Sequence, residues 1–199
     1  MKTLVIIDVQ NDFMPGGALG VPDGNEIVPV INRIIPHFDR VLATLDWHPV
    51  NHISFASVHG KPIGSLYGEN QILWPDHCIQ DTPGSGFSKG LEVGNVEAVF
   101  YKGTDPMVDS YSAFFDHARN RSTGLEGYIR KHELTNLFFV GLATDYCVLS
   151  SVIDALDLGF AVTLIRDGCK AINLHPDDEK LTIEKMQQKG ARIIDSMQI

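Results

Sequence analysis

The sequence predicts an α/β fold of three layers, α/β/α, with a six-stranded and mostly parallel β-sheet in the middle. Two observations favour this fold. Short apolar runs rich in β-branched residues alternate with longer stretches of helical periodicity. The apolar runs are also nearly unbroken in Val, Ile and Leu, which is typical of strands covered by helices on both faces.

Six apolar runs have the length and composition of buried strands: residues 3–9, 40–45, 96–101, 137–141, 161–165 and 191–194. Helical stretches lie between most of them, at residues 25–38, 124–132, 144–158 and 176–189. The segment of residues 47–95 has no such pattern and is rich in Gly, Pro, His and Ser. Loops of that length usually carry a functional site, so we expect one there.

Length and composition favour a single domain, residues 1–199, with one sizeable core, because 44% of the residues are hydrophobic. The net charge of -9 and the lack of a basic block argue against nucleic acid or an anionic membrane as partner. We therefore expect a small-molecule partner and a monomer or small homo-oligomer.

The chain starts without a signal-peptide pattern, and its three cysteines form no CxxC pair, so we expect reduced thiols and a cytoplasmic protein.

Polar residues follow four of the predicted strands. Asp8 closes the first strand, Asp46 and His48 follow the second, Lys102 follows the third, and residues 144–147, which end in Cys147, follow the fourth. In an open parallel sheet ligands bind at the carboxyl ends of the strands, so we expect these side chains to meet there. Cys147 also opens a helix, where free N–H groups favour a thiolate. An acid, an amine and a thiol supply the base, charge partner and nucleophile of covalent acyl transfer, with a structural cysteine as the alternative.

A second group of residues has the spacing of metal ligands. Asp46 and His48 form an Asp-x-His pair at a strand end, and His77 comes from the long loop. Three protein ligands leave positions open on an ion, which indicates a catalytic or substrate-binding site. These ligand types accept zinc, iron or manganese alike. Hydrogen-bonded loop histidines are the alternative, and Cys78 has no ligand role because its side chain points away from His77 in an extended segment.

Aromatic side chains near both groups are candidates for the walls of a flat aromatic substrate site, with ordinary core packing as the alternative. They are Phe13, Trp74, Tyr111 and Tyr146. We interpret His59, His175 and Cys169 as structural.

Six stretches of the chain carry a resemblance to a known family. They are residues 7–13 (IDVQNDF), 46–49 (DWHP), 54–56 (SFA), 74–78 (WPDHC), 109–115 (DSYSAFF) and 141–147 (GLATDYC). In combination they resemble the bacterial nicotinamidase/pyrazinamidase family of isochorismatase-like cysteine hydrolases, which have a Rossmann-like fold. The resemblance runs through nearly the whole chain.

The resemblance implies roles for individual side chains. It implies a catalytic triad of Asp8, Lys102 and Cys147. It implies Asp46, His48 and His77 as ligands of one divalent metal ion, Zn, Fe or Mn, within a metal-binding loop segment of about residues 46–95. His52 matches a histidine that lines the metal site in some members, directly or through water, and its role stays open.

The resemblance also implies a reaction, the hydrolysis of nicotinamide to nicotinate and ammonia through a thioester on Cys147, as part of NAD salvage. Pyrazinamide is a further expected substrate. A cis peptide bond between Leu142 and Ala143 is implied, with the N–H groups of Ala143 and Cys147 as the oxyanion hole. Two alternatives stay open: a sibling cysteine amidohydrolase acting on another small amide, and a non-enzymatic metal- or nucleotide-binding module.

Overall fold

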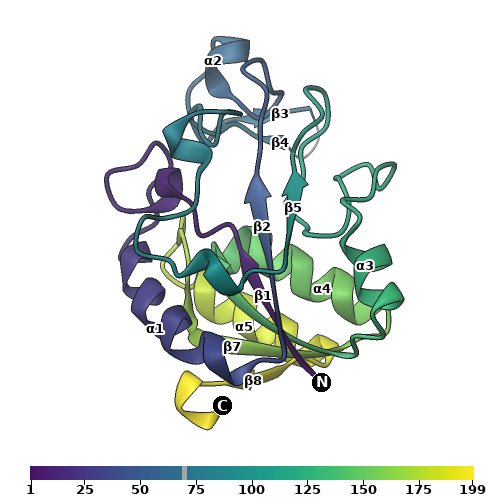
Figure 1. Ribbon diagram of the computed structural model, residues 1–199. Helices are drawn as coiled ribbons and strands as arrows, with labels where there is room; N and C mark the ends of the chain where they lie inside the picture. Colours follow the sequence, from purple (N-terminus) through teal and green to yellow (C-terminus); the bar gives the residue numbers. More distant parts are fainter. Residues whose placement is uncertain (69–70) are drawn as a thin grey trace.

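The computed structural model describes residues 1–68 and 71–199 and confirms the three-layer architecture (Figure 1). A six-stranded sheet runs through the middle in the order β5-β2-β1-β6-β7-β8. Its strands are β1 (Lys2–Ile7), β2 (Arg40–Asp46), β5 (Ala98–Lys102), β6 (Asn136–Leu142), β7 (Ala161–Lys170) and β8 (Arg192–Ile194). All five pairings between neighbouring strands of this sheet are parallel. The carboxyl ends of the six predicted strands therefore point to one edge.

Helices cover both faces of the sheet, as predicted. One face carries α1 (Ile27–Ile34), and the other carries α3 (Leu125–Lys131), α4 (Leu149–Asp157) and α5 (Asp178–Lys189). Two of the predicted helices are divided. Short 3-10 turns flank α1, and the π-helical turn Thr144–Val148 precedes α4. None of the helices in the described part of the chain is long and apolar enough to span a membrane.

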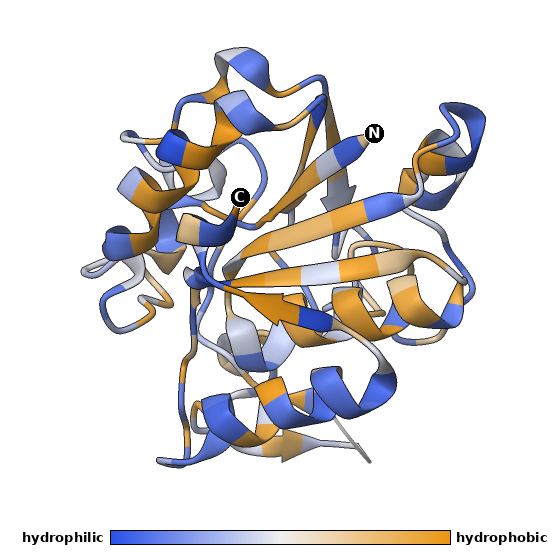
Figure 2. Ribbon diagram, turned by 90° about the horizontal axis from the view of Figure 1, so that it is seen from below, coloured by the Kyte–Doolittle hydropathy of each residue, from blue (hydrophilic) through white to orange (hydrophobic). Residues whose placement is uncertain are grey.

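Alternate side chains of β1 pack into two separate cores. Leu4 and Ile6 join the core beneath α1, whereas Val5 and Ile7 join the core beneath α3 and α4. All four are fully buried. Since side chains of a strand point alternately to its two faces, a strand covered on both sides is apolar at every position. Figure 2 shows the result, with central strands orange over most of their length and helices that alternate between orange and blue.

The segment between β2 and β5 arches over the carboxyl ends of these two strands (Figure 1). It contains the short helix α2 (Ala56–His59) and an antiparallel pair of two-residue strands, β3 (Leu66–Tyr67) and β4 (Gln71–Ile72). The sequence predicts a long loop here, and most of the segment is one. Elements of two to four residues are too short to show a period, so the pattern does not reveal them.

Candidate active site

The structure brings the four strand-end side chains of the sequence analysis together. Asp46 and Lys102 are the last residues of β2 and β5 and lie opposite each other in the register of the sheet. Asp8 directly follows β1, and Cys147 lies in the turn after β6. One carboxylate oxygen each of Asp8 and Asp46 and the sulfur of Cys147 lie within 4.8 Å of one another. All four side chains are buried.

Lys102 stands at the centre of this group. Its Nζ lies 2.9 Å from Asp8 Oδ2 and 2.5 Å from Asp46 Oδ1. It also donates to the carbonyl of Ser110 at 3.1 Å and to Sγ of Cys147 at 3.3 Å. Burial by itself lowers the pKa of Lys102, but the carboxylates of Asp46 and Asp8 outweigh burial and raise it well above its ordinary value. The site therefore holds a permanent positive charge next to the thiol.

Burial raises the pKa values of both Asp8 and Cys147. Burial raises the pKa of Asp8 above its usual value despite the opposing charge of Lys102. Burial also raises the pKa of the Cys147 thiol well above its ordinary value, and Lys102 only partly offsets this. The resting sulfur therefore keeps its proton, which differs from the thiolate that the helix start predicts. A buried thiol needs a base, and a carboxylate of raised pKa beside it suits that role.

Thr44 fixes the carboxylate of Asp8, because its hydroxyl donates to Oδ1 at 2.6 Å. On the opposite side, β6 runs close to β1 at Gly141. A Cβ atom there would lie 2.0 Å from the carbonyl oxygen of Ile7, and φ is +122°, so only glycine fits. The nearby peptide bond between Leu142 and Ala143 is cis, as the resemblance implies.

Ala143 begins the turn that carries the thiol. Its carbonyl oxygen accepts the N–H groups of Tyr146 and Val148, both at 3.1 Å. This closes the π-helical turn around Cys147 and places the Ala143 backbone at the start of the same turn. The N–H groups of Ala143 and Cys147 stay the predicted oxyanion donors.

The three predicted metal ligands converge beside the triad. Oδ2 of Asp46 lies 3.4 Å from Nε2 of His48 and 3.8 Å from Nε2 of His77. The other ring nitrogens are held by carbonyl oxygens, Nδ1 of His48 by Gly103 at 2.8 Å and Nδ1 of His77 by Pro75 at 2.7 Å. A carbonyl oxygen can only accept, so both Nδ1 atoms donate. Nε2 of each ring faces the carboxylate, so that a neutral ring directs its lone pair there, which is the arrangement of metal-binding histidines.

The electrostatics of this cluster favour a cation. Burial alone raises the pKa of Asp46, but Lys102 and His48 outweigh it and leave the carboxyl below its usual value. Burial is the largest single effect on the pKa of His48 and lowers it, but Asp46, Asp109 and the Gly103 carbonyl together outweigh burial and raise it. Burial and His48 together lower the pKa of His77 to about 4. The carboxyl of Asp46 is thus ionised and the imidazole of His77 neutral, the states in which both can bind a cation. The donor set of two imidazoles and one carboxylate fits a divalent metal ion.

The pocket between the two clusters is small and aromatic. Phe13, Trp74, Tyr111 and Tyr146 line it, as predicted, and its volume is about 20 Å³. The indole N–H of Trp74 donates to the hydroxyl of Tyr111 at 2.9 Å, and the ring of Tyr146 meets Trp74 edge-on at 5.0 Å. Such a volume holds about one water molecule, so the pocket is closed around its polar groups.

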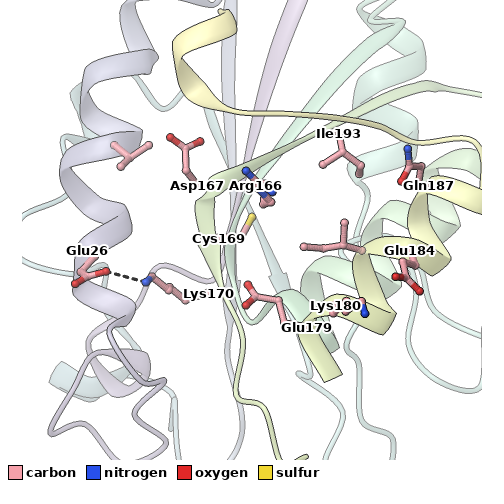
Figure 3. A pocket seen from close by; sticks show the side chains of 12 residues that line it. Glu26, Arg166, Asp167, Cys169, Lys170, Glu179, Lys180, Glu184, Gln187 and Ile193 are labelled. Atoms are coloured by element: carbon pink, nitrogen blue, oxygen red, sulfur yellow. Dashed lines mark hydrogen bonds and ion pairs between the residues drawn. The ribbon is translucent and has the colours of Figure 1, made fainter. Parts of the chain in front are cut away.

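A larger cleft of about 750 Å³ lies between α1 and α5 beside β7 (Figure 3). Charged side chains line most of it, and Lys170 is paired with Glu26 at 2.7 Å. Cys169 lies beneath it, buried, and burial raises the pKa of its thiol. The clusters of potential metal ligands among the described residues all lie around Asp46 and His48 instead. The small pocket is therefore the candidate site.

The remaining histidine and cysteine candidates lie outside the small pocket. His59 hydrogen-bonds the carbonyl of Ile53 through Nε2 at 2.8 Å. Cys78 is fully buried and joins the core that contains Phe13. His175 is exposed and lies outside the pocket. All three cysteines are free thiols.

Two residues at the site received no role from the sequence. Asp109 is buried and lines the pocket. Gln10 is buried two residues after Asp8, and its side-chain amide both donates to the carbonyl and accepts from the N–H of Asp46, each at 2.8 Å. Gln10 thereby fixes the backbone of Asp46 against the chain that follows β1. Gln10 lies in the stretch of residues 7–13 and directly follows the first predicted strand, so a search of every polar residue after a strand would have found it. Asp109 lies in the stretch of residues 109–115.

Comparisons with known proteins agree with this geometry. The sequence pattern of the isochorismatase domain matches residues 2–198. A nicotinamidase of Escherichia coli strain K12 is 46% identical over 199 residues, which cover 96% of this chain and 93% of the relative. The solved structure of an Acinetobacter baumanii nicotinamidase pyrazinamidease has a TM-score of 0.95 and 40% identity, covering 99% of this chain and 97% of that one. A pyrazinamidase of Pyrococcus horikoshii in complex with zinc has a TM-score of 0.81 and 37% identity, covering 98% of both chains. The chain belongs to the isochorismatase domain family.

Proposed function

We propose that this protein is a metal-dependent nicotinamidase, which hydrolyses nicotinamide to nicotinate and ammonia through a thioester on Cys147. The observation that carries the proposal is that a buried acid, amine and thiol meet a metal-ligand cluster beside an aromatic pocket, which the thiol and the three ligands line. The named relatives support the substrate class, an amide on a nitrogen-containing aromatic ring, and pyrazinamide as a second substrate.

Cys147 is the nucleophile of the first half-reaction. Asp8 takes the thiol proton as Sγ attacks the carboxamide carbon, and the ammonium of Lys102, close to both groups, stabilises the negative charge that passes between them. The N–H groups of Ala143 and Cys147 hold the oxyanion. Asp8 then gives the proton to the amide nitrogen, the C–N bond breaks, and ammonia leaves a nicotinoyl thioester.

Asp8 acts again in the second half-reaction. Its carboxylate takes a proton from a water molecule, whose oxygen attacks the thioester carbon. The C–S bond breaks and nicotinate leaves. The proton passes from Asp8 to the sulfur of Cys147, which restores the resting thiol that burial favours.

Asp46, His48 and His77 hold the metal ion. When bound, the ion supplies a Lewis-acidic point that holds the ring nitrogen of the substrate and so sets its orientation. We favour zinc, because the similar Pyrococcus horikoshii pyrazinamidase contains it, and iron and manganese accept the same donor set. Phe13, Trp74, Tyr111 and Tyr146 wall the ring. The closed pocket must widen for substrate to enter.

The test is the release of ammonia and nicotinate from nicotinamide by purified, zinc-loaded protein, before and after chelation. We expect turnover that chelation removes and zinc restores. The sibling-hydrolase alternative predicts ammonia from ureido or carbamoyl compounds and none from nicotinamide. That outcome would replace the proposed substrate, whereas turnover of nicotinamide that is insensitive to chelation would remove the metal from the mechanism.

A further inference from the structure

Asp145 joins the turn that carries the thiol to the loop that follows β7. It lies two residues before Cys147, in the π-helical turn Thr144–Val148. Its Oδ1 accepts the backbone N–H of Ile172 at 3.0 Å, and its Oδ2 accepts that of Asn173 at 2.8 Å. Two successive N–H groups form a concave site for an anion, and φ of Asn173 is +53°, in the left-handed region. One carboxylate thereby fixes two consecutive peptide groups of the loop.

The loop that Asp145 holds supplies one wall of the small pocket. Ile172 lines this pocket together with Tyr146 and Cys147, the two residues that follow Asp145 in the chain. The side chain of Ile172 is half-buried and packs against the core beneath α1. An apolar side chain makes no directional contact, so its position follows the backbone that carries it. The carboxylate of Asp145 therefore sets the distance between this wall and the thiol.

The thiol has supports of its own. Lys102 donates to Sγ of Cys147 at 3.3 Å, and the hydroxyl of Ser151 donates to the carbonyl of Cys147 at 2.6 Å. Ser151 is buried in α4 and also accepts the N–H of Ala113 at 2.9 Å. Loss of the Asp145 carboxylate should therefore release the wall of the pocket and leave the nucleophile in place.

We propose that Asp145 is a positioning residue that holds Ile172 against the substrate ring and so sets the affinity for nicotinamide. The two oxygens of its carboxylate accept the two N–H groups that flank the Cα atom of Ile172. The side chain on that Cα closes one side of the pocket. Asp145 acts through this wall and touches neither the substrate nor the reacting atoms. The inference rests on the substrate and the thiol of the proposed function.

Steady-state kinetics with nicotinamide test the role of Asp145. Asp145→Asn keeps the size of the side chain, but its NH₂ group cannot accept an N–H, so one of the two hydrogen bonds is lost. We expect KM to rise about 10-fold, the lower end of the cost of a misfit in an apolar pocket, while kcat stays close to the wild-type value.

Asp178→Asn is the matched control for this measurement. Asp178 accepts one N–H of the same loop, that of His175 at 2.8 Å, and an amide oxygen can keep this single bond. Its KM should equal that of the wild type. Loss of folded protein lowers kcat and leaves KM unchanged, so a fall in kcat alone for Asp145→Asn would overturn the proposal, as would unchanged constants.

A double-variant cycle tests whether Asp145 acts through Ile172. Ile172→Ala keeps the backbone N–H and shortens the wall, so it should raise KM by itself. Because Asp145 places this side chain, Asp145→Asn in the Ile172→Ala background should raise KM little further. Effects that multiply in full would show that Asp145 acts elsewhere, which contradicts the proposal.

Alkylation of Cys147 by iodoacetamide gives a measurement that needs no turnover. The pocket beside the sulfur is closed, at about 20 Å³, so release of the wall should expose the thiol. Since the loss of a hydrogen bond to a charged group favours the open state by about 10-fold or more, we expect Asp145→Asn to react about 10-fold faster than the wild type. Asp178→Asn should react at the wild-type rate.

Mass spectrometry of the Cys147 peptide separates this thiol from Cys78 and Cys169. Equal alkylation rates in Asp145→Asn and the wild type would overturn the proposal, and turnover of nicotinamide by the wild type would leave the proposed function standing. If the wild type releases no ammonia from nicotinamide, the proposed function fails, and the alkylation rates still decide whether Asp145 holds the wall.

Discussion

Asp46 and Lys102 form an ion pair at 2.5 Å through Oδ1, while Oδ2 of the same carboxylate faces the imidazoles of His48 and His77. One side chain thereby connects the proposed catalytic triad to the proposed metal ligands. The two partners occupy opposed positions at the ends of β2 and β5. The sheet itself therefore sets the distance between the thiol chemistry and the ion.

Replacement of a metal ligand should reduce metal content. Asp46→Asn replaces the anionic ligand by a neutral amide, and His77→Ala removes an imidazole. We expect both to lose more zinc affinity than the roughly 10–100-fold that is typical of changes at residues that only support a ligand. Asp46→Asn should also lower turnover by zinc-saturated protein more than His77→Ala does, because only Asp46 pairs with Lys102. Elemental analysis measures the zinc content, and chelator competition measures the zinc affinity. Cys78→Ser, next to His77, is the control and should keep its zinc; unchanged zinc in both ligand variants would contradict the assignment.

Asp8→Asn should abolish most turnover without changing the shape of the site. A neutral amide cannot take the thiol proton, and general-base catalysis contributes typically about 10²–10⁴-fold. We therefore expect kcat for nicotinamide to fall within that range, whereas the affinity for nicotinate and zinc stays near the wild-type value. A higher KM with unchanged kcat would show that Asp8 binds substrate and does not act as the base.

Gly103→Ala should damage the metal site through the ring of His48, which the Gly103 carbonyl holds. Gly103 has φ of +62°, and an added Cβ would lie 2.3 Å from the ring of His48, whose Nδ1 its carbonyl holds. We expect a loss of about 1–3 kcal/mol in the free energy of unfolding, with weaker zinc binding. Gly127→Ala in α3 is the control, because the added methyl meets no atom there and should stabilise the helix by about 0.5–1 kcal/mol. Denaturant titrations and zinc competition give both values, and equal behaviour of the two variants would contradict this placement of His48.

The sequence predicts the layers and strand ends well because both depend on local pattern. The unbroken apolar run of β1 reflects burial on both faces, and polar residues after such runs must lie at the carboxyl edge of a parallel sheet. The same rule points to Asp8, Lys102 and Cys147, and the resemblance to a known family narrows their roles.

Other features of the site depend on contacts between distant segments and have no local signal. The carboxylate of Asp109, for example, accepts the side-chain amide of Gln71, which lies 38 residues earlier in the chain, in β4. The protonated state of Cys147 differs from the sequence-based expectation for the same reason. A helix start favours a thiolate, but the depth of burial, which the pattern does not give, has the larger effect.

The position of the ring nitrogen should decide which amides are hydrolysed. If the ion holds the nitrogen while Cys147 attacks the carboxamide carbon, nitrogen must lie meta to the amide, as in nicotinamide and pyrazinamide. Benzamide lacks the nitrogen, and loss of a polar contact that a site is built to make costs on the order of 10⁴-fold in kcat/KM, against about 10–200-fold for a misfit in an apolar pocket. Measured kcat/KM values therefore distinguish a ring nitrogen held by the ion from selection by pocket shape alone. Comparable values for benzamide and nicotinamide would show that the nitrogen is not held.

The central claim is covalent hydrolysis of nicotinamide by Cys147, and the rate of ammonia release at saturating nicotinamide, compared between the wild type and Cys147→Ala, tests it most directly. The variant should fold and bind zinc as the wild type does, since Cys147 is not among the proposed metal ligands. We expect its ammonia release to fall by at least about 10⁴-fold, because the oxyanion donors and binding groups alone supply little of the rate. A folded, zinc-loaded Cys147→Ala that retains a tenth of the wild-type rate would contradict the thioester mechanism.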